Sequence, residues 1–262
     1  MKRTLRNALF ALLVATAPSL ASAQDTATLV EGADATLFGA QINSWAKLDA
    51  DGQVVEAGIT LPMAVLEDAP AEHHRDTPSA DVRIDFPAVV QDTTFLDHAG
   101  FFWEAQGHFP DQRYGVPHWD FHFFSLSGSD ADAIDCSDLS QVAPEEVAPG
   151  WFPPVPPGAP AIDFCVPAMG FHSLPASEFQ ANGELRAQAF DMVMIGGYYA
   201  GSFVFVEPMV TQAAMLRRES FGLPVPVPAS TEGGTYPTTF EAIYDPSVDA
   251  YHLVFRDFAN VD

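Results

Sequence analysis

The stretch Tyr-Gly-Val-Pro-His-Trp-Asp-Phe-His-Phe-Phe-Ser-Leu, residues 114–126, decides the fold of this chain. Within it, each of His118, Asp120 and His122 is followed by an aromatic residue. Because a strand sends successive side chains to opposite faces, a strand here gives one face three potential metal ligands and the other face three aromatic rings. A helix would also bring His118 and His122 together, but it would scatter the aromatic rings around its axis. We therefore predict a strand.

The rest of the chain predicts further short strands separated by turns. The Asp51-Gly52 step between two β-rich runs is typical of a hairpin. Residues 129–163 are rich in Asp, Pro and Ala, and this proline density excludes helix and central strand. Residues 177–187 and 211–220 have modest helical character. These patterns predict a mainly β chain: a single antiparallel β-sandwich or barrel-like domain over residues 36–262, with long Pro-rich loops and one or two short helices.

The N-terminus resembles a secretory leader. A basic start is followed by an apolar run and by Ala21-Ser22-Ala23, a small-residue cleavage pattern. We expect residues 1–23 to be a signal peptide, although a retained anchor is the alternative, and we expect residues 24–35 to be a flexible mature N-terminus. The predicted location is therefore periplasmic or secreted.

The composition is strongly acidic. The chain carries 35 acidic and 11 basic residues, for a formal net charge of −24. Loss of the leader would remove three of those basic residues and no acidic one. Such a charge repels nucleic acid and anionic membrane surfaces, so we expect neither partner after leader removal. A small-molecule ligand and a homo-oligomer both stay open.

The chain has two cysteines, Cys136 and Cys165. An even pair in an exported chain predicts a disulfide, which here would close the Asp- and Pro-rich excursion. The alternative is a pair of thiolate metal ligands.

The polar face of the predicted strand suggests a site for one transition metal ion. Imidazole and carboxylate ligands suit zinc best, without excluding iron, copper, nickel or manganese. In a regular strand, however, His118 and His122 lie about 13 Å apart, which is too far for one ion. Either a bulge brings them together, or Asp120 binds together with only one of them. Beyond the strand, His172 and Glu207 are the further candidate ligands.

Several separated motifs also resemble an uncharacterised family of exported bacterial proteins, classed as a domain of unknown function. The motifs, over roughly residues 36–220, are Gly107-His108-x-Pro110, Tyr114, Pro117-His118-x-Asp120-Phe121-His122-Phe123, Met169-Gly170-x-His172 and Phe205-x-Glu207-Pro208-Met209. This chain departs from the family pattern at Phe109 and Trp119, which removes no ligand type. The resemblance implies that His118, Asp120, His122, His172 and Glu207 belong to one site. We expect His108, Tyr114 and Glu104 to surround these ligands.

The resemblance supplies no reaction, so three functions remain. The first is an exported metal-binding protein without catalysis. The second is a zinc-dependent hydrolase or lyase, in which Asp120 or Glu207 would act as general base and the 151–157 loop would cover the pocket. The third is a structural or assembly protein in which the polar cluster only stabilises the fold.

Overall fold

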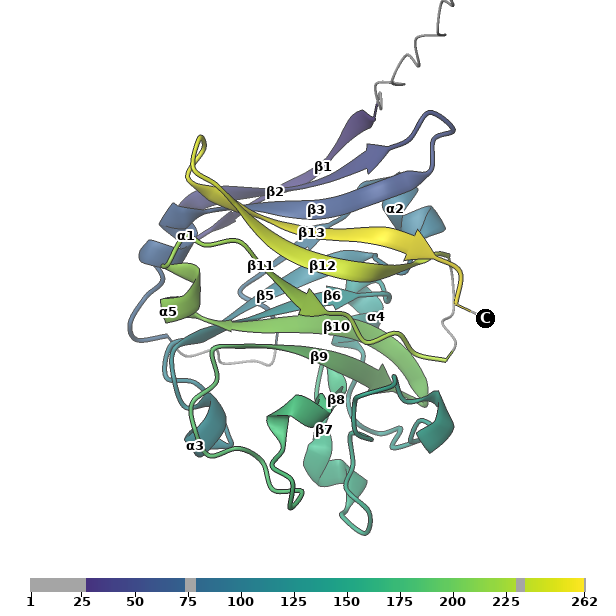
Figure 1. Cartoon of the computed structure of the whole chain (residues 1–262). Coiled ribbons are helices and arrows are strands. Elements are labelled where there is room, and N and C mark those ends of the chain that lie inside the picture. The colour runs from purple at the N-terminus through teal and green to yellow at the C-terminus, as the bar shows by residue number, and fades with distance from the viewer. Residues whose placement is uncertain (1–26, 74–78, 230–233, 262) are drawn as a thin grey trace, which may run out of the picture.

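The protein is a two-sheet β structure. The computed structural model describes residues 27–73, 79–229 and 234–261, and the predicted leader lies outside them. All strand pairs within the two sheets are antiparallel, so the prediction of a mainly β, antiparallel sandwich or barrel-like fold is confirmed (Figure 1). Among the described helices, none is both long and apolar enough to cross a membrane.

The first sheet has six strands and forms the upper part of Figure 1. In spatial order they are β1 (Thr28–Leu37), β2 (Ala40–Leu48), β3 (Val54–Pro62), β13 (Ala250–Ala259), β12 (Tyr236–Asp245) and β11 (Phe221–Pro224).

The second sheet has seven strands and curls beneath the first. In spatial order they are β4 (Val82–Asp85), β5 (His98–Glu104), β6 (His118–Phe124), β10 (Ser202–Thr211), β9 (Met192–Tyr199), β8 (Gly170–Ser173) and β7 (Cys165–Val166). The strand predicted from the sequence is therefore a central strand, β6, and all seven of its residues are buried.

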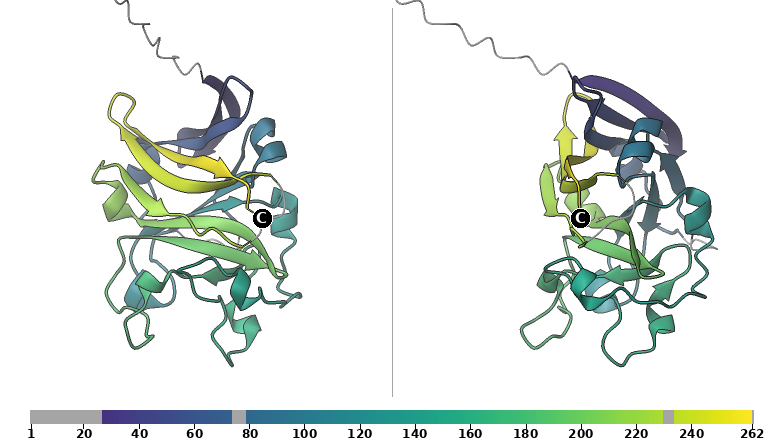
Figure 2. Two further views of the ribbon diagram at one scale, coloured as in Figure 1. Left: turned by 45° about the vertical axis from the view of Figure 1, so that its right-hand side comes forward. Right: turned by 90° about the vertical axis from the view of Figure 1, so that its right-hand side faces the viewer.

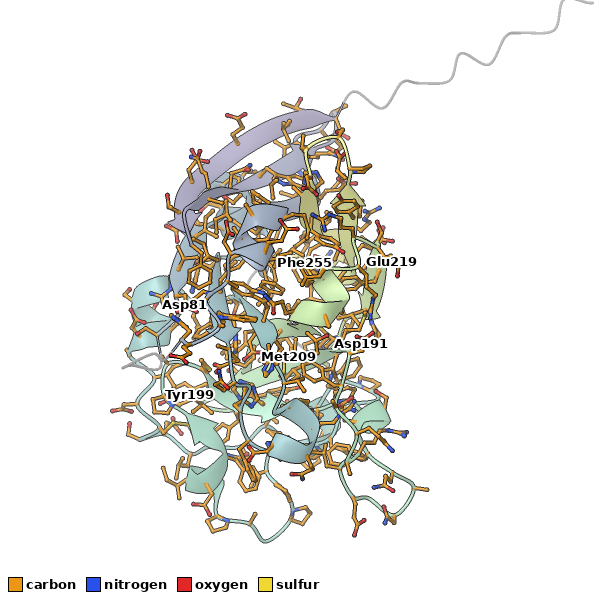
Figure 3. The ribbon with its side chains drawn as sticks, turned by 90° about the vertical axis from the view of Figure 1, so that its left-hand side faces the viewer. Asp81, Asp191, Tyr199, Met209, Glu219 and Phe255 are labelled. Carbon is orange, nitrogen blue, oxygen red and sulfur yellow. A yellow bond between two sulfur atoms is a disulfide. The ribbon has the colours of Figure 1, made fainter. Side chains whose placement is uncertain are left out.

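The aromatic face of β6 packs into the core between the sheets. Trp119, Phe121 and Phe123 all belong to the main hydrophobic cluster. The ring of Phe123 lies 4.8 Å from that of Phe255 on β13 of the opposite sheet. Figure 3 labels Phe255 within this packed interior. The opposite face of β6 therefore points away from the core, as the alternation predicts.

The two sheets approach each other along one edge. Ser44 of β2 donates a hydrogen bond from its hydroxyl to the carbonyl of Asp85 in β4, at 2.6 Å. A Cβ at Gly32 of β1 would lie 2.2 Å from the Ser44 hydroxyl, so only glycine allows this approach. The views of Figure 2 show the resulting barrel-like curvature.

Within the described residues, eight short helical segments connect the strands, more than the one or two expected. They are α1 (Met63–Glu67), α2 (Ala88–Thr93), α3 (Asp111–Tyr114), α4 (Gly128–Asp132), α5 (Gln212–Met215) and the 3-10 turns η1 (Pro144–Glu146), η2 (Ala161–Phe164) and η3 (Ala176–Glu178). A proline directly precedes each of α1, α2 and α3, where its fixed φ helps to start a turn. The apolar pattern of the sequence does not predict these turns. Of the two predicted helices, residues 211–220 contain α5, whereas residues 177–187 form η3 and extended chain.

The expectation of a flexible N-terminus is wrong for residues 28–35, which belong to β1. This strand pairs with β2 through a tight turn in which Phe38 and Gly39 both have positive φ. Its small and polar residues are mostly exposed at the edge of the sheet, which is why their composition resembles that of a loop.

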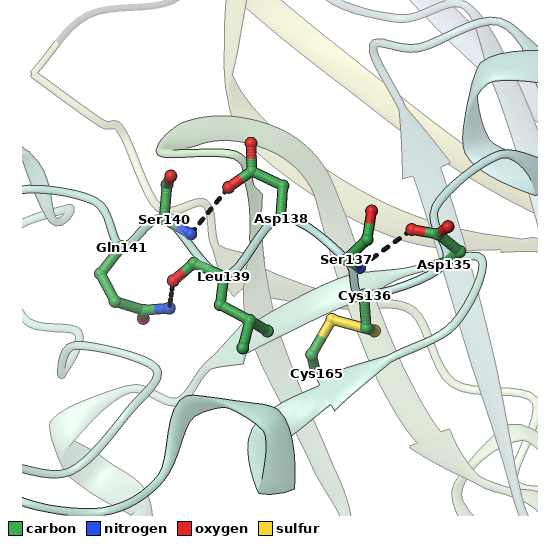
Figure 4. The surroundings of a disulfide bond; sticks show 8 residues. All are labelled: Asp135, Cys136, Ser137, Asp138, Leu139, Ser140, Gln141 and Cys165. Atoms are coloured by element: carbon green, nitrogen blue, oxygen red, sulfur yellow. Dashed lines mark hydrogen bonds between the residues drawn. A yellow bond between two sulfur atoms is a disulfide. The ribbon is translucent and has the colours of Figure 1, made fainter.

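The Asp- and Pro-rich excursion is an ordered segment. Cys136 and Cys165 form a disulfide, 29 residues apart in sequence (Figure 4). Trp151 donates from its indole nitrogen to the carbonyl of Met194 at 3.1 Å, and packs against the main core cluster. The excursion therefore covers the end of the sandwich at β8 and β9, and its loops gather at the lower end of Figure 1.

Candidate metal centre

The outer face of β6 carries His118, Asp120 and His122, and all three side chains are buried. Strand pairing is regular here, because no register shift interrupts β6 against β5 or β10. The bulge that would have brought His118 and His122 onto one ion is therefore not present. Instead, each end of this row meets different partners.

His122 meets Glu207 and His172. The pairing of Val206 with Phe123 places Glu207 directly across from His122. The Glu207 Oε2 atom lies 3.5 Å from the Nε2 atom of His122 and 3.5 Å from the Nε2 atom of His172. The three ligand atoms lie within 4.8 Å of one another, and these residues are called the Glu207 group below.

Aromatic rings enclose the Glu207 group. The His122 ring lies 4.7 Å from the rings of both Phe102 and Phe205. Phe205 also lies 5.1 Å from His172. A Cβ at Gly197 would lie 2.1 Å from the Phe205 ring, so the glycine lets this ring lie flat on β9 beneath both histidines.

This apolar enclosure disfavours charge in the Glu207 group. Burial raises the pKa of Glu207 well above its usual range, and the negative charges of Asp120 and Glu104 raise it further. Burial also lowers the pKa of His172 to about 4, although the charge of Asp120 partly opposes it. Without a cation, the group therefore favours a protonated Glu207 carboxyl beside a neutral His172 imidazole.

His118 and Asp120 form a second cluster with His108, called the Asp120 group below. The Nε2 atom of His118 lies 3.1 Å from Asp120 Oδ1, and the Nε2 atom of His108 lies 3.5 Å from Asp120 Oδ2. On the far side of each ring, Nδ1 lies against a backbone carbonyl: that of Val116 for His118, at 2.7 Å, and that of Phe109 for His108, at 2.9 Å.

Charge is favoured in the Asp120 group. Burial would lower the pKa of His108, but its contact with the Asp120 carboxylate outweighs burial and raises this pKa to about 9. Burial would likewise raise the pKa of Asp120, but His118 and His108 outweigh it and hold this pKa far below its usual value. In the absence of a metal, a proton on His108 therefore balances Asp120.

Two residues expected to surround the ligands lie near the Asp120 group. Glu104 pairs with His118 in the register of β5 and β6. The Tyr114 ring lies 5.7 Å from that of His108, and its hydroxyl donates to Glu178 Oε2 at 2.9 Å. Glu178 in turn receives two hydrogen bonds of 2.7 Å from Arg113. Nothing in the sequence pattern indicated Glu178. Through these hydrogen bonds, Glu178 of η3 holds α3 in place, together with the chain next to His108.

The five predicted ligands and His108 thus share one sheet face but divide into two groups. His118 and Asp120 lie with His108, which we had expected only to surround the site, and His122 lies with His172 and Glu207. Of the 151–157 loop expected to cover the pocket, Trp151 and Val155 pack against the main core cluster, on the other side of the sheet. Side chains from α3, α4 and the segment before β9 cover this face instead, in clusters that include Tyr114, Ala131 and Phe190. Figure 3 labels Met209 of β10, which pairs with Asp120 of β6.

Comparison with known proteins gives one match. Residues 49–103 match the model of a family described as TTHB210-like, hypothetical protein TTHB210. No curated protein matches the chain, and neither does any solved structure. The matched segment runs from the turn before β3 to β5 and ends before His108, so it contains none of the six candidate ligands.

Proposed function

We propose that this protein binds a transition metal ion through His122, His172 and Glu207. The observation that carries the proposal is the Glu207 Oε2 atom, which lies 3.5 Å from the Nε2 atoms of both histidines. Glu207 is 2% exposed, and this oxygen makes no hydrogen bond among the described residues. A buried carboxylate oxygen without a hydrogen bond is costly, and a cation between it and two imidazoles would remove that cost.

The spacing of the three atoms fits ligands better than it fits an ion pair. Charge-assisted hydrogen bonds between nitrogen and oxygen are about 2.7–2.9 Å long. Ligand atoms bound to one tetrahedral zinc ion at about 2.1 Å lie about 3.4 Å from one another. The 3.5 Å separations therefore favour coordination.

Zinc is the metal that this ligand set suits best. Two imidazoles and one carboxylate are a common zinc environment, and zinc in such sites is usually tetrahedral. The ion would be bound after export, because the leader pattern, the disulfide and the acidic composition are typical of a periplasmic or secreted protein.

A metal-dependent hydrolase or lyase is the second candidate. Three protein ligands leave one tetrahedral position for water, which zinc acidifies. The His172 side chain is 23% exposed, which gives the Glu207 group a route to solvent. Asp120, on the same face of β6, is the nearby candidate for a general base.

Two cavities lie away from the ligand groups. One, of about 210 Å³, is lined by residues that include Val142, Tyr198 and Phe203. Another, of about 420 Å³, lies on the six-stranded sheet beside Trp45 and His252. Neither of these cavities is lined by a residue of the two ligand groups, so neither offers a substrate a place beside the proposed ion.

Elemental analysis tests the proposal directly. Protein isolated from the periplasm without added metal should contain a transition metal. His122→Ala and Glu207→Gln should each lower the amount of metal bound per chain. His252→Ala is the matched control, because this histidine lies on the other sheet and bonds to Thr60. Unchanged metal content in both ligand variants would refute the proposal and leave the cluster as a structural polar network. Hydrolase activity that depends on Asp120 would favour the enzyme.

A further inference from the structure

The Asp120 group is a second set of metal-ligand side chains on the same sheet face. Its three ligand atoms, from His108, His118 and Asp120, lie within 4.8 Å of one another, as those of the Glu207 group do. His118 is fully buried, and Asp120 is 5% exposed. Neither Nε2 of His118 nor Oδ1 of Asp120 makes a hydrogen bond of good geometry among the described residues.

The backbone fixes how both histidines of this group face Asp120. Each Nδ1 lies against a backbone carbonyl, so Nδ1 must carry a hydrogen and donate it. In a neutral imidazole, Nε2 then keeps its lone pair, and here that lone pair points at a carboxylate oxygen. Two lone pairs directed at a carboxylate repel it unless a proton or a metal ion lies between them. A backbone carbonyl behind each ring is also the usual arrangement around a metal-binding histidine.

The distances fit an ion. The two contacts with Asp120, of 3.1 and 3.5 Å, lie on either side of the 3.4 Å or so that separates two ligands of a tetrahedral zinc ion. These are the same ligand types as in the Glu207 group, two imidazoles and one carboxylate. The same class of divalent transition metal therefore suits both groups.

The two groups cannot share one ion. His118 and His122 are four residues apart on a regular strand, so their backbones are separated by about 13 Å. Metal–nitrogen bonds are only about 2 Å long, so one ion cannot bind both histidines, and each of them belongs to its own cluster of ligand atoms that lie within 4.8 Å of one another. We infer that the protein has a second metal site, formed by His108, His118 and Asp120 and separate from the one at the Glu207 group.

This inference extends the proposed function from one ion to two and relies on it only for the class of metal. The competing account is a metal-free group in which a proton on His108 balances Asp120. The His108 side chain is 38% exposed, so an ion can enter the group from solvent beside it. The same exposure makes His108 the ligand whose removal disturbs the packing least.

Metal stoichiometry of the mature protein tests the second site. The protein is stripped with a chelator and dialysed against buffered Zn²⁺ for elemental analysis, and Co²⁺ is titrated in parallel by visible absorption. We expect two equivalents in the wild type, one in His108→Ala, one in His172→Ala, and none in the double variant. His252→Ala, which touches neither group, should keep two. Asp120→Asn, which preserves side-chain shape, should also lose one equivalent and serves as the second variant if His108→Ala does not fold.

The outcomes separate the two proposals. One equivalent that is lost in His172→Ala and kept in His108→Ala would overturn the second site and leave the proposed function standing. One equivalent that is lost in His108→Ala and kept in His172→Ala would support the Asp120 group and refute the Glu207 group. No bound metal in the wild type would refute both.

Discussion

Glu207→Gln should nearly abolish the stabilisation that zinc gives the protein. The substitution keeps the shape of a side chain that is 2% exposed, but replaces the oxygen shared by His122 and His172 with a neutral amide. A site filled at 100 times its dissociation constant stabilises the native state by about 2.7 kcal/mol. For a domain of 150–250 residues, that free energy corresponds to a rise in Tm of about 5–10 °C. If the substitution weakens binding about 100-fold, the gain at the same zinc concentration falls to about 0.4 kcal/mol, or roughly 1 °C.

The assay is a thermal melt of metal-free protein with and without zinc, for the wild type, Glu207→Gln and the control His252→Ala. To isolate the Glu207 group, all three proteins also carry His108→Ala. The control should retain the full zinc-dependent shift. An equal shift in Glu207→Gln and the control would refute the assignment of Glu207 as a ligand.

The pH dependence of the same melts gives an independent check. Burial raises the pKa of Glu207 in the metal-free native state well above its unfolded value of about 4.3. The native state therefore keeps a proton that the unfolded state releases, so this contribution to stability is complete below about pH 4.3 and is lost as pH rises toward the native pKa. Metal binding has the opposite dependence, because the carboxyl must lose its proton to coordinate the ion. Zinc should thus stabilise the protein more at pH 8 than at pH 5, and Glu207→Gln should remove most of that difference.

Three further predictions concern the scaffold. Cys136→Ser opens a loop of 29 residues and should cost about 3–4 kcal/mol in urea unfolding; an unchanged midpoint would contradict the constraint assigned to the disulfide. Arg113→Met leaves the Glu178 carboxylate buried without its ion pair and should cost about 3–5 kcal/mol, whereas adding Glu178→Leu should restore most of the loss; a double variant as unstable as the single one would contradict this account. Phe123→Ala empties a core position and should cost about 3–5 kcal/mol, against little change for Phe109→Ala, whose residue is 85% exposed; equal costs would place Phe123 outside the core.

The parts of the fold that follow from local pattern could be predicted. The alternation from His118 to Phe123 predicts a strand with one aromatic face, and the structure has that strand with its rings in the core. The first strand was missed because its small, polar residues lie at an exposed sheet edge, where burial leaves no periodic pattern. The short helices were missed because single turns after a proline show too few residues for a helical period.

Assembly of the Glu207 group depends on strand pairing, which no local pattern reveals. His122 and Glu207 are 85 residues apart in sequence and face each other only because β6 pairs with β10 in one register. His172 belongs to β8, two strands beyond β10, and its ring comes close because Gly197 on the intervening β9 has no side chain. A resemblance between motifs could suggest these residues as one set, but it could not divide them between two groups.

The division itself follows from the geometry of a regular strand. Residues four apart on one face, such as His118 and His122, are separated by about 13 Å, which exceeds the span of two ligands on one ion. A row of histidine, aspartate and histidine on such a strand must therefore take further ligands from outside it or remain a polar network. Here the further side chains come from both directions, Glu207 from the neighbouring strand and His108 from the turn before β6. The Asp120 carboxylate contacts His108 and His118, so Asp120→Asn should leave metal binding by the Glu207 group in place. An insertion that bulged β6 would instead disrupt both groups.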